Sequence, residues 1–468
     1  MNNNPESNPT PQEALNQSSE LDPGNLQTPH FFGRTDWLSF GLTTVLVLGA
    51  YLFTLAPDVT LDSSGILSVG AMYAGVPHPP GFPVWTIYAH LFTLLPFSNV
   101  AWRVALSSAV AGALTSGGIA LMVSRGGTLL VEAISLPAKI RLEELRALRV
   151  VSSCVAGMAF GFDGAFWRAA INADPWPFSL LLLAVVLCLL MRWVQTPCRW
   201  RYLYGASFVY GLTLTNSQIL LAAALGLQFV VMFGYPKLIR ETCMANAVLF
   251  MAGLAAERAG YLETISVHEG EVNILRVVFF LVGVGSTVTC IVLIVQTRRL
   301  FTEWKTIQIC GVLFLLGLLA YIYEPIASMT NPPVNWAYAR TADGFIHLLT
   351  RGQYEKLQPT AQLARFLEQL QTCADVTLTK FGLLYVLVAL IPFCNLRRLT
   401  TLGRQWMFGL LAVYFSLAFF LPIVLNPSHD RSSREFFMVG YSASHLVLAI
   451  CTGYGLVTLG VLFARRTA

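Results

Sequence analysis

Apolar segments of about 20 residues recur along this chain of 468 residues, and they constrain the fold more than any other feature. A helix of about 20 residues crosses the hydrocarbon core of a bilayer, where a helix also satisfies its own backbone hydrogen bonds. The pattern therefore predicts an all-α polytopic membrane protein with about twelve transmembrane helices. The expected spans are 37–56, 104–124, 150–171, 176–193, 203–217, 218–234, 243–256, 275–297, 306–323, 381–394, 405–425 and 437–463.

Two of these assignments depend on where a helix ends. Residues 203–234 read either as one long segment or as two short ones. The run 243–256 is too short to span comfortably unless its helix continues past Glu257.

Composition excludes the other broad classes of protein. Only 12% of the residues are charged and 55% are hydrophobic, whereas soluble domains carry roughly 25% charged residues. The net charge of +5 does not indicate nucleic-acid binding, because the basic residues lie beside apolar segments rather than in one patch. Residues 1–36 are rich in Asn, Pro, Gln, Ser and Glu and are expected to be a disordered cytoplasmic tail, followed by one transmembrane domain over 37–468.

Lys and Arg set the expected orientation. They concentrate in every second loop, and such loops face the cytoplasm. The sequence thus predicts a multi-pass integral membrane protein with both termini in the cytoplasm, and the membrane we expect is a bacterial inner (cell) membrane. Two large loops, 57–103 and 324–380, then lie on the outer face.

The first outer loop concentrates the unusual residues. Its halves, about 64–75 and 83–96, are too short to span and are expected to be interfacial helices. Asp58 and Asp62 follow the first span, and a proline turn presents His78. A partly buried carboxylate there could act as general base toward a hydroxyl. The alternative is a turn role for the aspartates and a packing role for the histidine.

The second outer loop, 324–380, contains Asn331-Pro332-Pro333 and an aromatic group. Loops of this length are usually functional or disordered. The aromatic residues argue against disorder: Trp336, Tyr338, Phe345 and Tyr354.

These motifs, in this order, resemble the C-type glycosyltransferase superfamily. The closer resemblance is to a bacterial protein O-mannosyltransferase-like membrane family (domain of unknown function 2723), which is related to eukaryotic transmembrane protein 260. That family typically has Thr-Leu-Ala-Pro, Val-Pro-His-Pro-Pro-Gly-Tyr-Pro and Asn-Val-Ala-Trp-Arg-Val. The matching segments here are Thr54–Pro57, Val76–Pro83 with Phe82 in place of Tyr, Asn99–Val104, Ala173-Asp174 and, more weakly, Asn331–Trp336 with Arg351–Tyr354.

One motif departs from that family. Where the family has Asp-Ser-Gly-Glu, this chain has Ser63-Ser64-Gly65-Ile66, with Asp62 one residue earlier and the Glu replaced. Either Asp62 takes the place of the family's aspartate, or the activity is altered or absent.

The resemblance implies a GT-C-like helical bundle and a glycosyltransferase activity. The expected reaction transfers a sugar, with mannose as the candidate, from a polyprenyl-phosphate donor. The expected acceptor is a protein Ser/Thr or glycan hydroxyl on the outer face of the membrane.

Arginines are the expected ligands of the lipid phosphate, because a guanidinium can bind two phosphate oxygens. Each could instead be an interfacial anchor. The best-placed candidates are Arg340 and Arg351, with Arg103 and Arg168 as alternates.

Three further residues are candidates for substrate binding. Trp336 and Tyr354 lie in the second outer loop, beside the predicted phosphate ligands. Asp174 either holds the acceptor or caps the helix that follows Pro175.

No metal or cofactor is expected, since the sequence contains neither Cys-x-x-Cys nor His-Glu-x-x-His. Two other functions stay open. A transporter or flippase of lipid-linked sugars usually has repeated halves, which this sequence does not show. A catalytically inactive scaffold would account for the missing Glu.

Overall fold

The computed structural model describes residues 31–61, 63–134, 141–260, 274–350, 360, 362–426 and 431–467. The chain divides into two units, Met1–Gly33 and Arg34–Ala468, and the second unit contains all the helices named below. Residues 1–30 of the predicted tail lie outside the described residues, whereas residues 34–36 already belong to a helix.

The second unit is built of helices, and the prediction of an all-α membrane protein is confirmed. Its described helices are α2 (Arg34–Thr54), α3 (Ser64–Met72), α4 (Pro83–Thr93), α5 (Val100–Ile134), α6 (Leu142–Gly161), α7 (Gly164–Ala170), α8 (Trp176–Gln195), α9 (Arg201–Asn216), α10 (Ala224–Gly234), α11 (Ile239–Arg258), α12 (Ile274–Thr297), α13 (Trp304–Leu318), α14 (Tyr323–Met329), α15 (Ala342–Leu349), α16 (Leu363–Val376), α17 (Leu383–Cys394), α18 (Thr401–Leu425) and α19 (Arg431–Thr467).

Each predicted span overlaps one or more of these helical segments, but within the described part of the chain fewer than the predicted twelve are long and apolar enough to cross a membrane. Among the described residues, nine helices are long and apolar enough to cross a membrane, and the pair α6–α7, bent by 73°, makes a tenth. The remaining two are shorter. Residues 203–234 form two segments, because α9 ends at Asn216 and Ser217 is extended before the 3-10 turn Gln218–Ala223 and α10.

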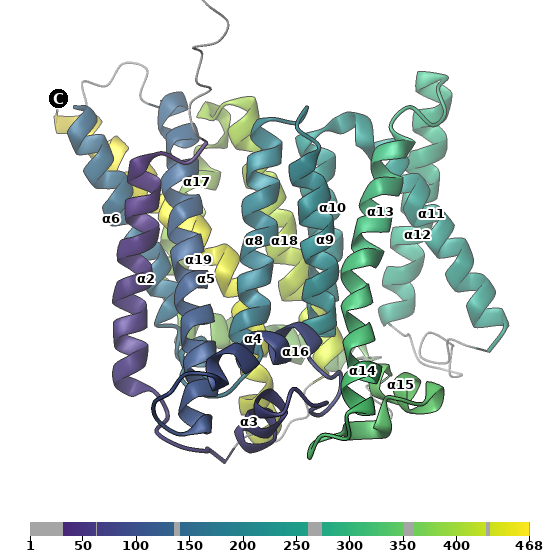
Figure 1. The fold of residues 1–468 in the computed structure, drawn as a ribbon. Coiled ribbons are helices and arrows are strands. Elements are labelled where there is room, and N and C mark those ends of the chain that lie inside the picture. The colour runs from purple at the N-terminus through teal and green to yellow at the C-terminus, as the bar shows by residue number, and fades with distance from the viewer. Residues whose placement is uncertain are drawn as a thin grey trace, which may run out of the picture. The chain divides into compact units, whose positions relative to one another are not determined.

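The helices alternate in direction through the bundle (Figure 1). The start of α2 and the end of α19 lie at one end, which we call the terminal end. The basic loops between α8 and α9, α12 and α13, and α17 and α18 lie at this same end. The opposite end, which we call the loop end, carries α3, α4, α14 and α15.

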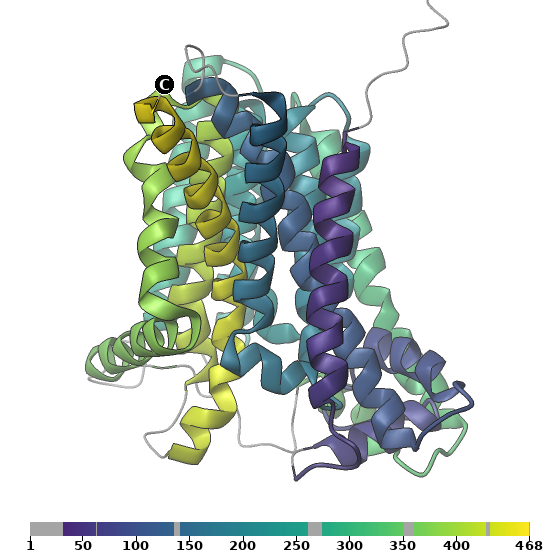
Figure 2. The ribbon, with the colours of Figure 1, turned by 90° about the vertical axis from the view of Figure 1, so that its left-hand side faces the viewer.

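The two short helices predicted in the first outer loop are present as α3 and α4, which lie across the loop end (Figure 1). The predicted second loop is largely helical, since α14, α15 and α16 all fall within it. Figure 2 shows α16 lying across the end of the bundle before the chain turns into α17. A π-helical segment, Thr377–Gly382, makes this turn.

Small residues allow the central helices to approach closely, as in other membrane bundles. A Cβ at Gly157 of α6 would come within 2.6 Å of the carbonyl oxygen of Ser116 in α5. The main core gathers around α5, α8, α18 and α19 and supports the segments at the loop end. Its completely or almost completely buried side chains include Phe160, Leu187, Trp193, Leu410 and Tyr454.

Candidate active site at the loop end

The Val76–Pro83 turn connects α3 to α4. The amide of Gly81 donates to the carbonyl of His78 at 3.0 Å and closes the turn. Gly81 has a φ of +98°, in the left-handed region that residues with a Cβ rarely adopt. Pro83 then begins α4, where its missing N–H removes no helix hydrogen bond. The Pro-Pro-Gly sequence thus fixes how the chain enters α4.

The structure brings this turn together with the second motif segment, Asn331–Trp336. The amide of Val76 donates to the carbonyl of Val334 at 3.0 Å, and the amide of Trp336 donates to the carbonyl of Val76 at 3.0 Å. The Tyr323 hydroxyl donates to the carbonyl of Gly75 at 3.3 Å. Two segments that the sequence singled out separately therefore form one wall of the loop end.

A buried amide holds α4 to the bundle. Asn216 accepts from the amide of Trp85 at 3.1 Å and donates to Ser179 Oγ of α8 at 2.6 Å. Polar groups at membrane depth commonly make such interhelical bonds. The bonds of Asn216 fix the first residues of α4, directly after the proline turn.

A second amide holds the segments around α14 and α15. Gln218 donates to the Tyr321 hydroxyl and to the carbonyl of Leu349, both at 3.1 Å. Tyr321 lies just before α14 and Leu349 ends α15. The break between α9 and α10 thus supplies the polar groups that position both sides of the loop end.

Glu324, at the start of α14, lies against the turn. A Cβ built at Gly81 would come within 2.3 Å of Glu324 Oε1, so the carboxyl group occupies the space that this glycine leaves. Glu324 is completely buried, and neither of its oxygens has a hydrogen-bond partner among the described residues. A buried polar group without a partner costs free energy, so it calls for a functional explanation.

Glu324 differs in this respect from the other described buried acidic residues. Buried charges are normally paired with an opposite charge, and the carboxyl group of Glu324 is an exception within the described part of this chain. The paired residues are Asp36, 2.6 Å from Arg149; Asp163, 2.7 Å from His445; and Glu241, which is bonded to Arg240.

Three further buried polar atoms, on α14 and the segment that follows it, lack partners within the described ranges: Ser328 Oγ, Asn335 Oδ1 and Trp336 Nε1. Ser328 is four residues from Glu324 and lies on the same face of α14. Asn335 Nδ2 donates to the carbonyl of Ser328 at 3.1 Å, and Trp336 packs with Val76. Together with Glu324 they form what we call the α14 polar cluster.

His78 is half-buried within the turn. Its Nδ1 lies 3.1 Å from the carbonyl oxygen of Pro79, and its ring meets Phe82 edge to face with centroids 5.1 Å apart. These local contacts hold the ring at the surface of the turn. A catalytic role for His78 stays a prediction.

The segment after α2 contains the predicted bases. Asp58 is exposed, and its Oδ1 accepts from the amide of Val59 at 2.8 Å. This contact is of the kind expected from a turn residue, which the sequence offered as the alternative. Asp62, the other predicted base, lies outside the described residues.

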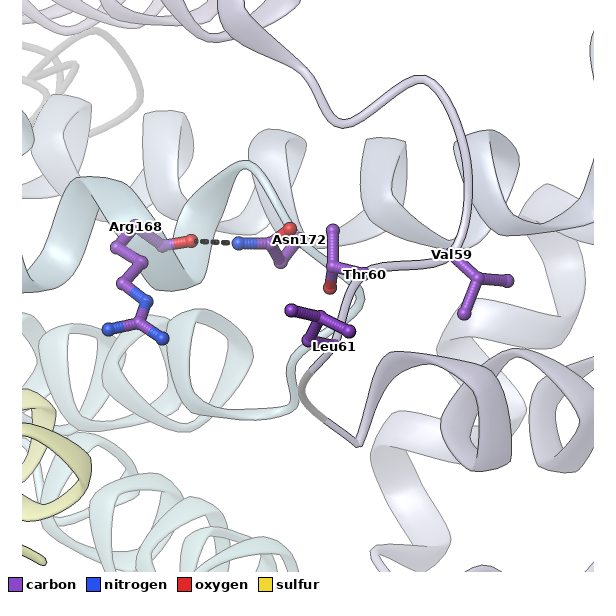
Figure 3. A pocket seen from close by; sticks show the side chains of 5 residues that line it. All are labelled: Val59, Thr60, Leu61, Arg168 and Asn172. Carbon is purple, nitrogen blue, oxygen red and sulfur yellow. Dashed lines mark hydrogen bonds between the residues drawn. The ribbon is translucent and has the colours of Figure 1, made fainter. Parts of the chain in front are cut away.

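A surface depression of about 590 Å³ lies between this segment and α7 (Figure 3). Asn172 donates to the carbonyl of Arg168 at 2.8 Å, and the guanidinium of Arg168 extends away from that bond. The depression therefore has one cationic side. Its lining residues are Val59, Thr60, Leu61, Arg168 and Asn172.

Arg103, an alternate phosphate ligand, is bonded to the backbone. It donates through Nη1 to the carbonyls of Thr93 and Leu95, at 2.5 and 2.6 Å. These bonds stabilise the end of α4, because they satisfy carbonyls that have no partner in the helix. Arg103 therefore helps to hold α4 in place, and a phosphate-binding role for it stays a prediction.

Arg340, a predicted phosphate ligand, is exposed at the loop end. It donates to Asn331 Oδ1 at 2.5 Å and lies over the ring of Tyr338. Trp336, from the same motif match, is half-buried in the wall that it forms with Val76. The structure thus places Arg340 and Trp336 on one segment. Their predicted companions, Arg351 and Tyr354, lie outside the described residues.

Asp174 lies directly before Pro175 and α8. Its Oδ1 accepts from the amide of Trp176 at 2.7 Å, which is the capping contact that the sequence offered as one alternative. The backbone of Asp174 is also bonded on both sides to Ser108 Oγ of α5. An acceptor-binding role for Asp174 stays a prediction.

A buried Asp–His pair lies at the bend between α6 and α7. Asp163 accepts from the amides of Ala165 and Phe166 through Oδ1, and its Oδ2 lies 2.7 Å from His445 Nδ1 of α19. His445 Nε2 lies 3.1 Å from Thr377 Oγ1 in the π-helical segment. The pair joins three elements far apart in the sequence.

Sequence reasoning missed Glu324 and His445 as site or support residues. Glu324 carried a signal, because it is an acidic residue at the end of an apolar span, where charged groups usually face protein or a cavity. The sequence carried no signal for the contact between Glu324 and Gly81, because no local pattern connects the two positions.

Comparison with known proteins agrees with the resemblance seen in the sequence. Residues 64–240 match the family model of the protein O-mannosyl-transferase TMEM260 N-terminal domain. The mouse protein O-mannosyl-transferase TMEM260 is 27% identical over 213 residues, which are 45% of this chain and 27% of the mouse protein.

The corresponding protein of Dictyostelium discoideum is 36% identical over 69 residues, or 14% of this chain and 8% of that protein. The alignments thus span less than a third of the length of either curated relative. No solved structure matches this chain.

The matched range contains α3, the Val76–Pro83 turn, α4 and α7, so it covers the first half of the loop end but not α14. Through these residues the chain is related to the TMEM260-like protein O-mannosyltransferase family.

Proposed function

We propose that this protein is a membrane glycosyltransferase that acts at its loop end. The observation that carries the proposal is the pairing of the Val76–Pro83 turn with Asn331–Trp336 at one end of the bundle. Carboxylates, arginines and aromatic side chains gather at that end, and residues 64–240 match a domain named for protein O-mannosyl transfer.

The proposed donor is a polyprenyl-phosphate sugar, with mannose favoured by the names of the relatives. The acceptor is a hydroxyl of a protein Ser/Thr or of a glycan. In this reaction the acceptor oxygen forms a bond to C1 of the sugar while the bond from C1 to the phosphate oxygen breaks. The hydroxyl proton passes to Asp62, or to Asp58, and polyprenyl phosphate leaves.

The leaving phosphate gains charge as the bond to C1 breaks. Arginines stabilise such charge through hydrogen bonds from a planar fork. Arg340 lies beside Tyr338, and aromatic rings of this kind suit the interface next to a prenyl chain. Arg168, at the depression that Leu61 lines, offers a second position.

The proposed orientation follows from the basic loops. They lie at the terminal end, so the positive-inside rule assigns that end to the cytoplasm and the loop end to the outer face. Both curated relatives are eukaryotic, and the bacterial inner membrane stays a prediction.

The test is transfer in proteoliposomes that contain the purified protein, polyprenyl-phosphate mannose labelled in the sugar, and Ser/Thr peptides. Release of labelled glycopeptide supports the proposal, and Asp62→Asn serves as the inactive control. Movement of the labelled lipid between leaflets without transfer would instead identify a flippase. Neither transfer nor movement would favour the inactive scaffold.

A further inference from the structure

The α14 polar cluster has no explanation in the fold. It combines a carboxyl group, a hydroxyl, an amide oxygen and an indole N–H, all buried and without partners among the described residues. The other buried acidic residues that the structure describes pair with Arg or His. Removing a polar group from water without a partner is costly, so these groups are expected to meet a ligand.

The chemistry of the cluster indicates a neutral polyol. A carboxyl group can form hydrogen bonds with two neighbouring hydroxyls, and Asn335 Oδ1 can accept another. Trp336 Nε1 donates, and Ser328 does either. A phosphate would need cationic partners in such a buried place, and no described Lys or Arg is bonded to Glu324.

We propose that Glu324, with Ser328, Asn335 and Trp336, binds the hydroxyl groups of the sugar carried by the donor. The inference rests on the proposed function, because it assigns the cluster to the same donor. It also gives Gly81 a role, since only a residue without a Cβ leaves room for the carboxyl group at the turn.

The cluster is covered in this structure, so the sugar reaches it only when the turn and α14 separate. Within the described residues, the contacts between the turn and these segments include two backbone bonds at Val76, a bond of 3.3 Å from Tyr323 to Gly75 and the apolar packing of Val76. Such bonds each contribute modestly to stability. Binding of the sugar then replaces them with hydrogen bonds to the carboxylate.

The experiment compares two ligands, polyprenyl-phosphate mannose and polyprenyl phosphate without sugar, each titrated into the full-length protein in nanodiscs. The wild type is expected to bind the sugar-bearing lipid about tenfold more tightly, the effect of one or two hydrogen bonds to the sugar. Glu324→Leu is expected to bind both lipids equally, at the affinity of the wild type for the bare lipid. Glu324→Gln, whose amide still forms hydrogen bonds, should keep only part of the preference.

Asp343→Asn is the matched control. Asp343 is exposed in the first turn of α15, so this change removes a negative charge from the same end without touching the cluster. It should keep the preference for the sugar-bearing lipid. A control that loses the preference would show that general charge, not Glu324, causes it, and would overturn the proposal.

Melting temperatures test whether the role of Glu324 is purely structural. Because the carboxyl group of Glu324 is unpaired among the described residues, Glu324→Leu should melt at or above the temperature of the wild type. A lower melting temperature for both variants, together with an unchanged preference for the sugar-bearing lipid, would overturn the proposal.

Failure of this inference is distinguishable from failure of the proposed function. If transfer occurs and both Glu324 variants keep the binding preference, the glycosyltransferase stands and the sugar site is elsewhere. If no transfer occurs but the wild type alone prefers the sugar-bearing lipid, the sugar site stands and the transferase does not. Equal binding of both lipids by the wild type overturns the sugar site whatever the activity.

Discussion

The carboxyl group of Glu324 lies directly against Gly81: a Cβ at position 81 would come within 2.3 Å of Oε1 and 2.8 Å of Oε2. These residues belong to different segments of the loop end, so their contact ties the proline turn to α14. A Cβ at position 81 would therefore meet both a positive φ and the carboxyl group of Glu324.

Gly81→Ala is expected to lower both the melting temperature and the transfer rate. The alanine must adopt a φ of +98° or rebuild the turn, which costs about 1–3 kcal/mol, and its Cβ displaces the carboxyl group. Gly49→Ala is the control, because a Cβ there meets nothing within 4 Å. Thermal melts of Gly81→Ala and Gly49→Ala measure the difference. Equal melting temperatures would contradict the importance of the contact between Gly81 and Glu324.

Asp62→Asn should reduce transfer by about 10²–10⁴-fold while the protein stays folded, because an amide does not take up the acceptor proton. Labelled-sugar transfer and a melting curve measure the two effects. A larger loss in Asp58→Asn would move the base to Asp58. Full activity in both variants would favour the inactive scaffold.

Arg340→Lys and Arg351→Lys should each raise the donor KM about tenfold and leave the acceptor KM nearly constant, since lysine lacks the fork that fits two phosphate oxygens. Separate titrations of donor and acceptor measure this. Arg103→Lys is the comparison, because Arg103 is bonded to carbonyls at the end of α4 and should affect stability instead. Unchanged donor KM values in both variants would move the phosphate site to Arg168.

A cysteine at Thr350 should react with an impermeant thiol reagent added outside intact cells, and a cysteine at Thr401 should not. Both positions are exposed, the first at the loop end and the second at the terminal end. The exposed native cysteines, Cys198 and Cys394, are first replaced by serine. The reverse labelling pattern would place the site on the cytoplasmic face.

His445→Phe should destabilise the protein by about 3–5 kcal/mol, because it leaves the buried carboxylate of Asp163 without its partner. Adding Asp163→Asn should recover much of the loss, since the amide oxygen still caps α7 and carries no charge. Unfolding in mixed micelles measures both variants. If the double variant is no more stable than His445→Phe, the unpaired carboxylate of Asp163 is not the cause of the lost stability.

The local features of the fold could be predicted from the sequence because each depends on nearby residues. Apolar length predicted the spans, and the proline turn between two short apolar halves predicted α3 and α4. The order of the basic loops predicted that the start of α2 and the end of α19 lie at one end.

The site depends on contacts between distant residues, and these were not predictable. No periodicity connects Gly81 to Glu324 or Asp163 to His445. The motif matches pointed to Val76–Pro83 and Asn331–Trp336 as separate segments. Their pairing is a property of how the intervening helices pack.

The hydrogen bond from Tyr323 to Gly75 joins residues 248 positions apart. A chain folds from its N-terminus as it is synthesised, and contacts of long sequence separation form late. The proline turn therefore stays without its second wall until α13 and α14 have entered the membrane. During biogenesis the Val76–Pro83 turn lacks this partner for all of that time, so a chain arrested before α14 has no means of forming the α14 polar cluster.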